Sequence, residues 1–186
     1  MRRLFHVGWS IIVCLVLVAC GTAPATDAGY TLIKAGSIQP GDPPPPPAGT
    51  VLLTLTGKIG MTNVEDRLEF DMETLEQIGL VEYTVDDPHL VETVTYQGVL
   101  LEQLLAVAQI PPDATELQAT AVDDYQTIIP LSVLQWPVMI ATIRDGERMP
   151  LTAKGPLQIA FPSTLDIDPI VYDPMWVWHL EALEVR

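Results

Sequence analysis

Basic side chains gathered in an acidic chain are the first residues that could do chemistry. The sequence carries 9 Lys and Arg against 24 Asp and Glu, for a formal net charge of −15. Arg144, Arg148 and Lys154 fall close together, and Gly155 follows directly. This local excess of positive charge could hold an anion or a phosphate group. The alternative is that these residues pair with neighbouring acids such as Asp145.

Two tryptophans near the C-terminus offer flat surfaces for a ligand. Trp176 and Trp178 are separated by one residue, so in a strand their side chains would share one face. Each indole adds one N–H donor to a large apolar surface, and the pair could either belong to the core or line a groove. His89, in a predicted turn, is a further candidate ligand-binding residue or simply a turn residue. His179 is expected to be structural.

Other catalytic and metal-binding chemistries find little support in the sequence. The two cysteines are Cys14 and Cys20, so residues 21–186 contain no thiolate ligand, cysteine nucleophile or disulfide. His89 and His179 without a cysteine make a weak case for zinc. Nucleophile-elbow serine, phosphate-loop and dinucleotide-binding motifs are absent. We therefore predict no catalytic residue and no metal ligand, and the acidic charge argues against nucleic acid.

The segment around the basic residues has the pattern of a β-hairpin. An apolar run over residues 138–143 leads to Asp145-Gly146, a dipeptide that favours a tight turn because glycine accepts positive φ. A second apolar run over residues 157–161 follows the basic residues. The predicted order is strand, tight turn, basic glycine loop, strand.

Helices are predicted at two places, with strands around them. Apolar residues at helical spacing predict a helix over residues 99–110, ended by Pro111-Pro112. Asp71 is the predicted N-cap of a short helix over residues 72–78, and Gly79 follows its end. Short strands are predicted over residues 51–57, 68–70, 81–85, 91–96, 117–122, 126–129 and 176–185. This alternation predicts an α+β fold, a single compact domain with a mixed β-sheet and a few short helices.

The N-terminal residues have the pattern of an export signal. Two arginines precede an apolar run over residues 11–19, which is too short to span a bilayer as a helix. The end of this run, Leu17-Val18-Ala19-Cys20, resembles the lipobox of bacterial lipoproteins. That resemblance implies cleavage before Cys20, acylation of Cys20, and a membrane-anchored protein of the cell envelope that faces the periplasm or the cell exterior. An ordinary secretory signal with a chance cysteine is the alternative.

Three parts of the chain are predicted. Residues 1–19 are a lipoprotein signal peptide, residues 20–49 a lipidated cysteine with a proline-rich linker, and residues 50–186 the folded domain. Five consecutive prolines over residues 43–47 favour polyproline II, a semi-rigid spacer. Cleavage would remove two arginines and no acid, so the mature charge would be −15 − 2 = −17. The lipid rather than electrostatics would then hold the protein at a membrane.

Four segments, taken in order, resemble the molybdopterin-binding domain of sulfite-oxidase-like oxidoreductases. They are TYQGVLLEQLLAVA (residues 95–108), LQATAVDDYQTIIPLSVL (117–134), ATIRDGERMPLTAKGPLQIAFP (141–162) and YDPMWVWHLEALEV (172–185). The chain looks closest to short, stand-alone members of that group. The resemblance implies the sulfite-oxidase-like fold, with the third segment running along a pterin site.

The sequence departs from the catalytic members of this family at the metal ligand. In those enzymes a cysteine thiolate upstream of the helix binds molybdenum, whereas the matching region here, residues 82–87, reads Glu-Tyr-Thr-Val-Asp-Asp. Thr or Asp cannot replace a soft thiolate without changing the electronic environment of the metal. The N-terminal pterin contacts and the second dimerisation domain of the longer enzymes have no counterpart either. We therefore expect no cofactor, with molybdopterin, held by the basic residues and a stacked tryptophan, as the alternative.

Three functions stay open at this point. The first is a non-catalytic module whose old pterin cleft binds a small anionic or aromatic ligand, or a partner protein of the envelope. The second is a molybdopterin-dependent oxidoreductase without thiolate ligation. The third is a scaffold or interaction lipoprotein with no small ligand. The first is favoured because loss of the thiolate removes the reason to retain the rest of the cofactor site.

Overall fold

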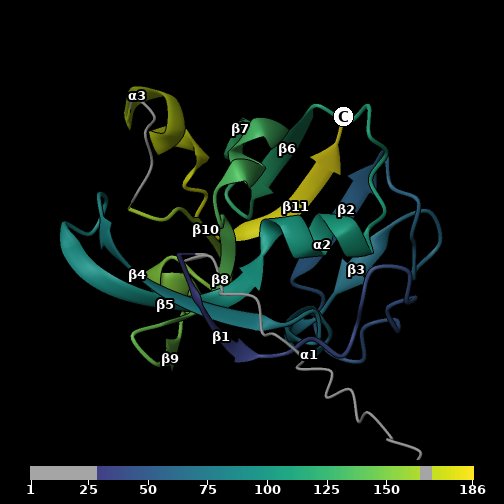
Figure 1. Cartoon of the computed structure of the whole chain (residues 1–186), viewed down its shortest axis with the longest axis horizontal. Coiled ribbons are helices and arrows are strands. Elements are labelled where there is room, and N and C mark those ends of the chain that lie inside the picture. The colour runs from purple at the N-terminus through teal and green to yellow at the C-terminus, as the bar shows by residue number, and fades with distance from the viewer. Residues whose placement is uncertain (1–28, 164–168) are drawn as a thin grey trace, which may run out of the picture.

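Two β-sheets frame the protein in the computed structural model, which describes residues 29–163 and 169–186 (Figure 1). The first sheet has the order β1-β4-β5-β8-β10, with β9 beside β8, and its strand pairs are antiparallel. Its strands are β1 (Thr31–Lys34), β4 (Leu80–Asp87), β5 (Glu92–Leu100), β8 (Met139–Arg144), β9 (Glu147–Arg148) and β10 (Gln158–Ala160).

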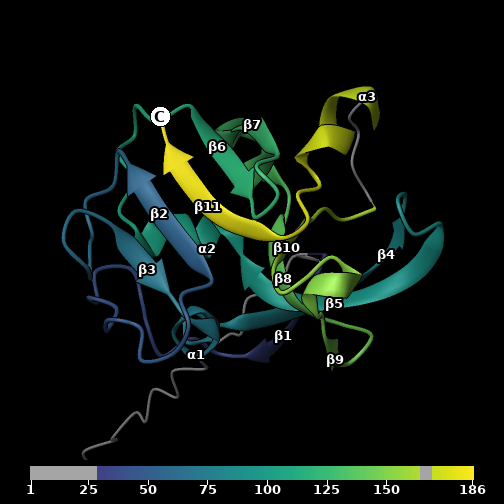
Figure 2. The same ribbon diagram turned by 180° about the vertical axis from the view of Figure 1, so that it is seen from behind.

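The second sheet is mixed and has the order β3-β2-β11-β6-β7. β11 runs parallel to β2 and antiparallel to β6, so the C-terminal strand lies in the middle of this sheet (Figure 2). Its strands are β2 (Leu53–Gly57), β3 (Leu68–Phe70), β6 (Glu116–Ala121), β7 (Gln126–Pro130) and β11 (Leu180–Val185). The predicted α+β fold is therefore confirmed, with two sheets in place of one.

The described helices are short. They are α1 (Met72–Glu76), α2 (Leu101–Val107), α3 (Pro169–Tyr172) and the 3-10 helices Leu131–Gln135, Leu151–Ala153 and Asp173–Met175. α2 lies in front of β11 and β2 in Figure 1 and behind them in Figure 2, so it covers one face of the second sheet. Leu101 and Leu104 on this helix are fully buried, as its apolar stripe predicts. None of the described helices has the length and hydrophobicity needed to cross a membrane.

Asp71 caps α1 as predicted and also ties down an earlier part of the chain. Its Oδ1 accepts the N–H of Thr74 at 2.8 Å, and its own N–H donates to Thr74 Oγ1 at 3.0 Å, which makes a capping box. Its Oδ2 accepts the N–H groups of Ala48 and Gly49 at 3.0 and 2.7 Å. One carboxylate therefore joins the helix start to the end of the proline-rich segment.

The prediction that residues 20–49 form a linker outside the fold is wrong for the described residues 29–49. β1 pairs with β4, and Ile38 is buried in the core with 6% of its surface exposed. The backbone N–H groups of Ser37 and Ile38 donate to Gln77 O just beyond α1. Composition does not separate a spacer from a docked segment, because a polyproline II stretch is solvated in a linker but also packs on protein surfaces in recognition motifs.

The predicted strand over residues 176–185 begins only at Leu180. Residues 176–179 lead irregularly from the 3-10 helix to β11, and Trp178 makes a single bridge to Gln158. His179 has φ 53°, which is incompatible with an extended strand. The period-2 argument therefore does not apply to the two tryptophans. In contrast, the predicted Asp-Gly turn is present between β8 and β9, with φ 50° at Asp145 and 82° at Gly146.

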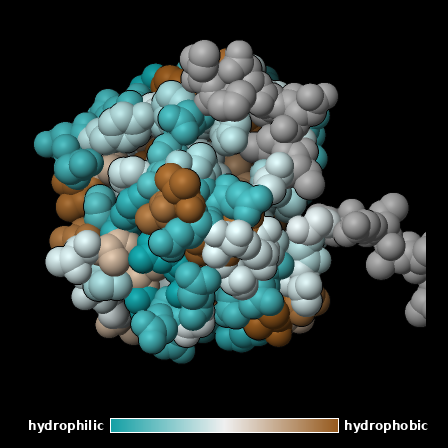
Figure 3. All heavy atoms as spheres, turned by 90° about the vertical axis from the view of Figure 1, so that its left-hand side faces the viewer, coloured by the Kyte–Doolittle hydropathy of each residue, from teal (hydrophilic) through white to brown (hydrophobic). Residues whose placement is uncertain are grey.

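Figure 3 shows the side of the molecule toward which the hairpin of β4 and β5 extends. On the described part of this face, hydrophobic side chains form small separate groups among hydrophilic ones. Hydrophilic residues cover most of the area, in line with the charge of −15. The described residues of this face therefore form no large hydrophobic patch of the kind that marks a protein interface.

Candidate ligand-binding site

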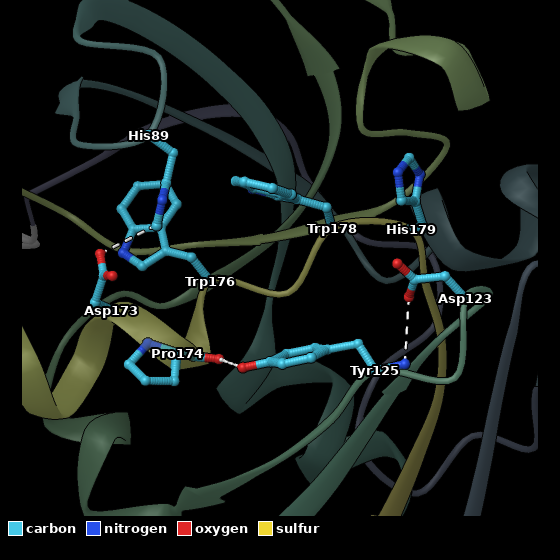
Figure 4. Close-up of a pocket in the computed structure, with 8 residues that line it drawn as sticks. All are labelled: His89, Asp123, Tyr125, Asp173, Pro174, Trp176, Trp178 and His179. Atoms are coloured by element: carbon cyan, nitrogen blue, oxygen red, sulfur yellow. Dashed lines mark hydrogen bonds and ion pairs between the residues drawn. The ribbon is translucent and has the colours of Figure 1, made fainter.

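A cavity of about 450 Å³ opens where turns from both sheets meet the segment before β11 (Figure 4). The turn after β4 supplies His89, and the turn between β6 and β7 supplies Asp123 and Tyr125. The remaining lining comes from one continuous stretch of chain, as Asp173, Pro174, Trp176, Trp178 and His179. Its size lies in the range of small-molecule sites.

The rings of Trp178 and Tyr125 lie on opposite sides of the open space. Both are seen edge-on in Figure 4, with the space between them. The Tyr125 hydroxyl donates to Pro174 O at 2.8 Å, which ties the β6–β7 turn to the C-terminal segment. Tyr125 is 43% exposed, so its ring is available to solvent and to a ligand. The two rings form a slot with aromatic walls.

His89 closes one end of this slot. Its ring meets Trp178 and Trp176 edge to face, with centroids 5.1 and 5.8 Å apart, and its Nε2 lies 3.3 Å from Asp173 Oδ1. The buried carboxylate of Asp87 positions this turn, because its Oδ1 accepts the N–H of His89 at 2.8 Å. His89 is therefore held in the site rather than exposed in a simple turn.

The side chain of Asp87 is itself held by a hydrogen bond from the first sheet. Its Oδ2 accepts the hydroxyl of Tyr96 at 2.6 Å, and Gln158 Nε2 lies 3.3 Å from the same hydroxyl. Burial, together with the hydrogen bond to Asp87, raises the pKa of Tyr96, so this phenol stays protonated as a donor. These hydrogen bonds fix the position of the turn that carries His89.

Two buried tryptophan donors beside the cavity have no hydrogen-bond partner. Among the described residues, five buried side-chain atoms lack one, and two of them are the indole nitrogens Trp176 Nε1 and Trp178 Nε1. A third, His89 Nε2, has the Asp173 carboxylate within ion-pair distance. Trp176 is only 6% exposed. An unsatisfied buried donor costs about 1–3 kcal/mol, so these two indole groups lower the stability of the fold beside the cavity.

Lys154 and Gly155 support the site from outside the cavity. Lys154 Nζ lies 3.6 Å from the centroid of the Trp178 ring, and burial lowers the pKa of this ammonium. Gly155 O lies 2.7 Å from His179 Nδ1, which holds the second imidazole. A Cβ at Gly155 would meet Met149 O at 2.0 Å, so only glycine allows this approach.

Unusual backbone conformations concentrate around the same cavity. Of the seven described non-glycine residues with positive φ, four flank or line it: Val91, Asp124, Lys154 and His179. Val91 is the least expected, because a β-branched side chain strongly disfavours its φ of 58°. Each such residue costs on the order of 1–3 kcal/mol, and strain of this kind gathers at functional sites.

The three basic residues that the sequence singled out do not form one anion site. Arg148 makes a two-pronged ion pair with Glu76, with Nη2 at 2.9 Å from Oε2, and it does not line the cavity. Burial raises the pKa of Glu76, but hydrogen bonds from Arg148 and Thr142 outweigh it and the pKa is lowered. Arg144 is half-buried, and its Nη1 has no hydrogen-bond partner.

Arg148 is therefore paired with an acid, but with Glu76 rather than with the neighbouring acids that the sequence suggested. Arg144 lies near Tyr96, whose pKa it acts to lower, and Lys154 lies over the ring of Trp178, but neither residue lines the cavity. Within residues 29–163 and 169–186, no three His, Cys, Asp or Glu side chains are grouped so that they could hold a metal.

The sequence identified three of the eight lining residues as ligand candidates, namely His89, Trp176 and Trp178. It did not identify Tyr125 or Asp173, and it treated His179 as structural. Tyr125 follows two aspartates in an ordinary turn sequence, and only the packing of the second sheet against the 3-10 helix brings it to the cavity. A site assembled from separate turns leaves no spacing signal in the chain.

Comparison with known proteins agrees with this architecture. Residues 58–168 match the family model described as the oxidoreductase molybdopterin binding domain. Among solved structures, the sulfane dehydrogenase SoxCD from Paracoccus pantotrophus is similar, with a TM-score of 0.54 at 19% identity over 72% of the present chain. The match spans only 37% of that SoxCD chain. No curated protein matches significantly. The structural likeness supports the sulfite-oxidase-like fold that the sequence predicted.

Proposed function

Since the chain belongs to the oxidoreductase molybdopterin-binding domain family, we propose that it uses this fold as a non-catalytic binding module of an exported lipoprotein. The observation that carries the proposal is the cavity lined by the aromatic rings of Tyr125, Trp176 and Trp178 together with His89. Such a cavity has the means to bind a small aromatic or anionic ligand.

The residues present do not fit a thiolate-ligated molybdenum centre. Residues 21–186 contain no cysteine. The region where the family resemblance would place that ligand lies in β4, where the Thr84 hydroxyl hydrogen-bonds to Thr95 Oγ1 at 3.0 Å. A hydroxyl is a much harder donor than a thiolate. We therefore derive no reaction step through molybdenum.

The test is the metal and pterin content of the purified protein. The full chain is exported from a molybdenum-replete host, and molybdenum and pterin fluorescence are measured on the same sample. We expect neither at a stoichiometric level, and no oxidation of sulfite. A thiolate-containing enzyme of the family, produced in the same host, serves as the control for cofactor supply. Stoichiometric molybdenum in the present protein would overturn the proposal.

A molybdopterin-dependent oxidoreductase is the second candidate function, and the family match itself favours it. Its cofactor would have to be held without a protein thiolate, by donors such as Arg144 Nη1 and the indole N–H groups. Pterin without metal in the purified protein would instead indicate a carrier or sensor. The same measurement therefore separates the two candidates.

A further inference from the structure

We infer that the cavity binds a flat aromatic cation. The ring of this ligand stacks between Tyr125 and Trp178, and its positive charge lies between the carboxylates of Asp123 and Asp173. The inference rests on the proposed function, because it names the ligand class of that binding module. Of the aromatic and anionic ligands considered there, it selects the aromatic kind and assigns it a positive charge.

Two aromatic side chains give the cavity the shape of a slot. Tyr125 and Trp178 lie on opposite sides of the open space and are both seen edge-on, which favours a flat ligand between them (Figure 4). The Tyr125 hydroxyl donates to Pro174 O at 2.8 Å, so this wall is fixed before a ligand enters. The faces of both rings carry negative charge density, so a flat cation gains attraction as well as stacking. A cavity of about 450 Å³ has room for two fused rings.

Two carboxylates give the lining its charge. Asp173 and Asp123 lie at opposite ends of the space between the two rings (Figure 4). Asp123 Oδ1 accepts the N–H of Tyr125 at 3.3 Å, which holds this carboxylate beside the slot. Asp173 Oδ1 lies 3.3 Å from His89 Nε2, and the Asp173 side chain is 53% exposed, so a ligand can reach it. Since no Lys or Arg lines the cavity, these carboxylates attract a cation and repel an anion.

One basic side chain lies close to the slot but outside it. Lys154 Nζ is 3.6 Å from the centroid of the Trp178 ring, and Lys154 does not line the cavity, so its ammonium covers the other face of that ring. The indole separates this ammonium from a ligand in the slot, whereas both carboxylates border the slot directly. The balance of nearby charge therefore favours a cation, most strongly on the Tyr125 side.

The arrangement fits an organic cation rather than a metal ion. Within the parts of the chain that the structure describes, no three His, Cys, Asp or Glu side chains are grouped so that they could hold a metal. The two carboxylates stand at opposite ends of the slot, and the rings between them supply no oxygen ligand of the kind that hard cations need. An aromatic cation spreads its charge over an apolar surface, which suits rings at its faces and carboxylates at its edges.

Three probes that share one bicyclic ring separate the effect of charge from that of shape. N-methylquinolinium is a cation, quinoline is neutral near neutral pH, and quinoline-2-carboxylate is an anion. Tetramethylammonium supplies the positive charge without the flat ring. Each probe is titrated by calorimetry and equilibrium dialysis into the full chain in a non-ionic detergent, with the detergent alone as the blank. We expect saturable binding of N-methylquinolinium, roughly tenfold tighter than that of quinoline or tetramethylammonium, and no binding of the carboxylate.

Variants test the charge and the shape separately. Asp123→Asn and Asp173→Asn keep the side-chain size, and each should weaken N-methylquinolinium binding roughly threefold while quinoline binding stays the same. Tyr125→Leu, which removes a wall of the slot at a part-exposed position, should weaken the binding of both rings roughly tenfold. Asp113→Asn makes the same change of charge outside the cavity, and Tyr30→Leu removes a tyrosine from a different cavity. These two controls should bind as the native chain does, and thermal melting of each variant checks that it folds.

Several results would overturn the inference. One is binding of quinoline, of its carboxylate or of tetramethylammonium that equals or exceeds binding of N-methylquinolinium. The others are binding of none of the four probes, and binding of the cation that both Asp→Asn variants leave unchanged. Stoichiometric molybdenum would overturn the proposed non-catalytic role instead, and the titrations are read separately from that measurement.

Discussion

At the scale of single residues, the site consists of ordinary side chains in uncommon surroundings. Asp87 is almost fully buried, yet it has no cation in direct contact among the ion pairs of the described residues. It instead accepts hydrogen bonds from Tyr96 and from the backbone of the His89 turn. A buried carboxylate used in this way orients its neighbours, because each accepted bond has a required direction.

Residue types predicted which side chains could bind a ligand, and the fold decides which of them line the cavity. The tryptophans and His89 were found from the sequence because aromatic side chains with a polar atom are few in this chain. The predicted anion site of basic residues is not formed, because the Arg148 guanidinium pairs with Glu76, which lies 72 residues away in the sequence. Pairing over such a separation depends on the fold and leaves no trace in local sequence.

Asp71 gives a prediction at this scale. Hydrogen bonds, first of all from the backbone N–H of Thr74, lower the pKa of Asp71 to about 2, and 6% of the residue is exposed. The folded-state pKa lies below the ordinary 3.8, so the ionised carboxylate stabilises the fold above that value and loses its effect as pH falls toward 2. Asp71→Ala should lower the free energy of unfolding by about 1–2 kcal/mol near neutral pH.

Urea denaturation of the native chain and of Asp71→Ala, from neutral pH downward, is the measurement. The difference between the two proteins should shrink as the solution is acidified through the interval between the two pKa values. Asp113→Ala, at an exposed surface pair with Lys58, is the matched control and should change stability by less than about 0.5 kcal/mol. A difference that grows on acidification would contradict the assignment.

At the scale of elements, local patterns predicted most strands and helices. The helix start at Asp71, the stripe of α2 and the Asp-Gly turn follow from capping, periodicity and glycine geometry, all of which are local. The failures concern segments whose conformation depends on a distant partner. β1 forms by pairing with the edge of β4. Residues 176–179 depart from a strand in the region where the turns around the cavity contact them, and Trp178 makes only one bridge, to Gln158.

The docking of the N-terminal segment is tested by Ile38→Ala. Ile38 is 6% exposed within the core, so its truncation should lower the free energy of unfolding by about 2–5 kcal/mol. Leu32→Ala, at a 60% exposed position of β1, is the control and should have an effect of less than about 0.5 kcal/mol. Equal effects of the two variants in denaturant titrations would show that residues 29–49 are undocked in solution.

At the scale of the whole molecule, the docked segment changes how the protein would sit at a membrane. The composition of residues 20–49 predicts a proline spacer between the lipid and the domain. Pro44 is instead buried, and Asn63 donates to Pro45 O at 3.0 Å. The chain from Cys20 to the first described residue, Gly29, then provides at most roughly 30 Å of reach. An acylated protein would keep its domain close to the bilayer.

Acylation of Cys20 is the last prediction. The sequence Leu17-Val18-Ala19-Cys20 and the short apolar run before it predict cleavage and lipid attachment, and two or more acyl chains anchor a protein stably. The intact mass of the exported protein should show a mature chain that begins at Cys20 and carries acyl groups, and the protein should partition into detergent. Cys20→Ala should be recovered without lipid and outside the membrane fraction. Since the charge of the mature chain would be −17, or −15 − 2, anionic lipids give the unlipidated variant no electrostatic attraction to compensate. The lipid anchor would be contradicted by an unmodified N-terminus in the native protein, or by a Cys20→Ala variant that still fractionates with membranes. Either result would leave the cavity to be judged on the binding experiments alone.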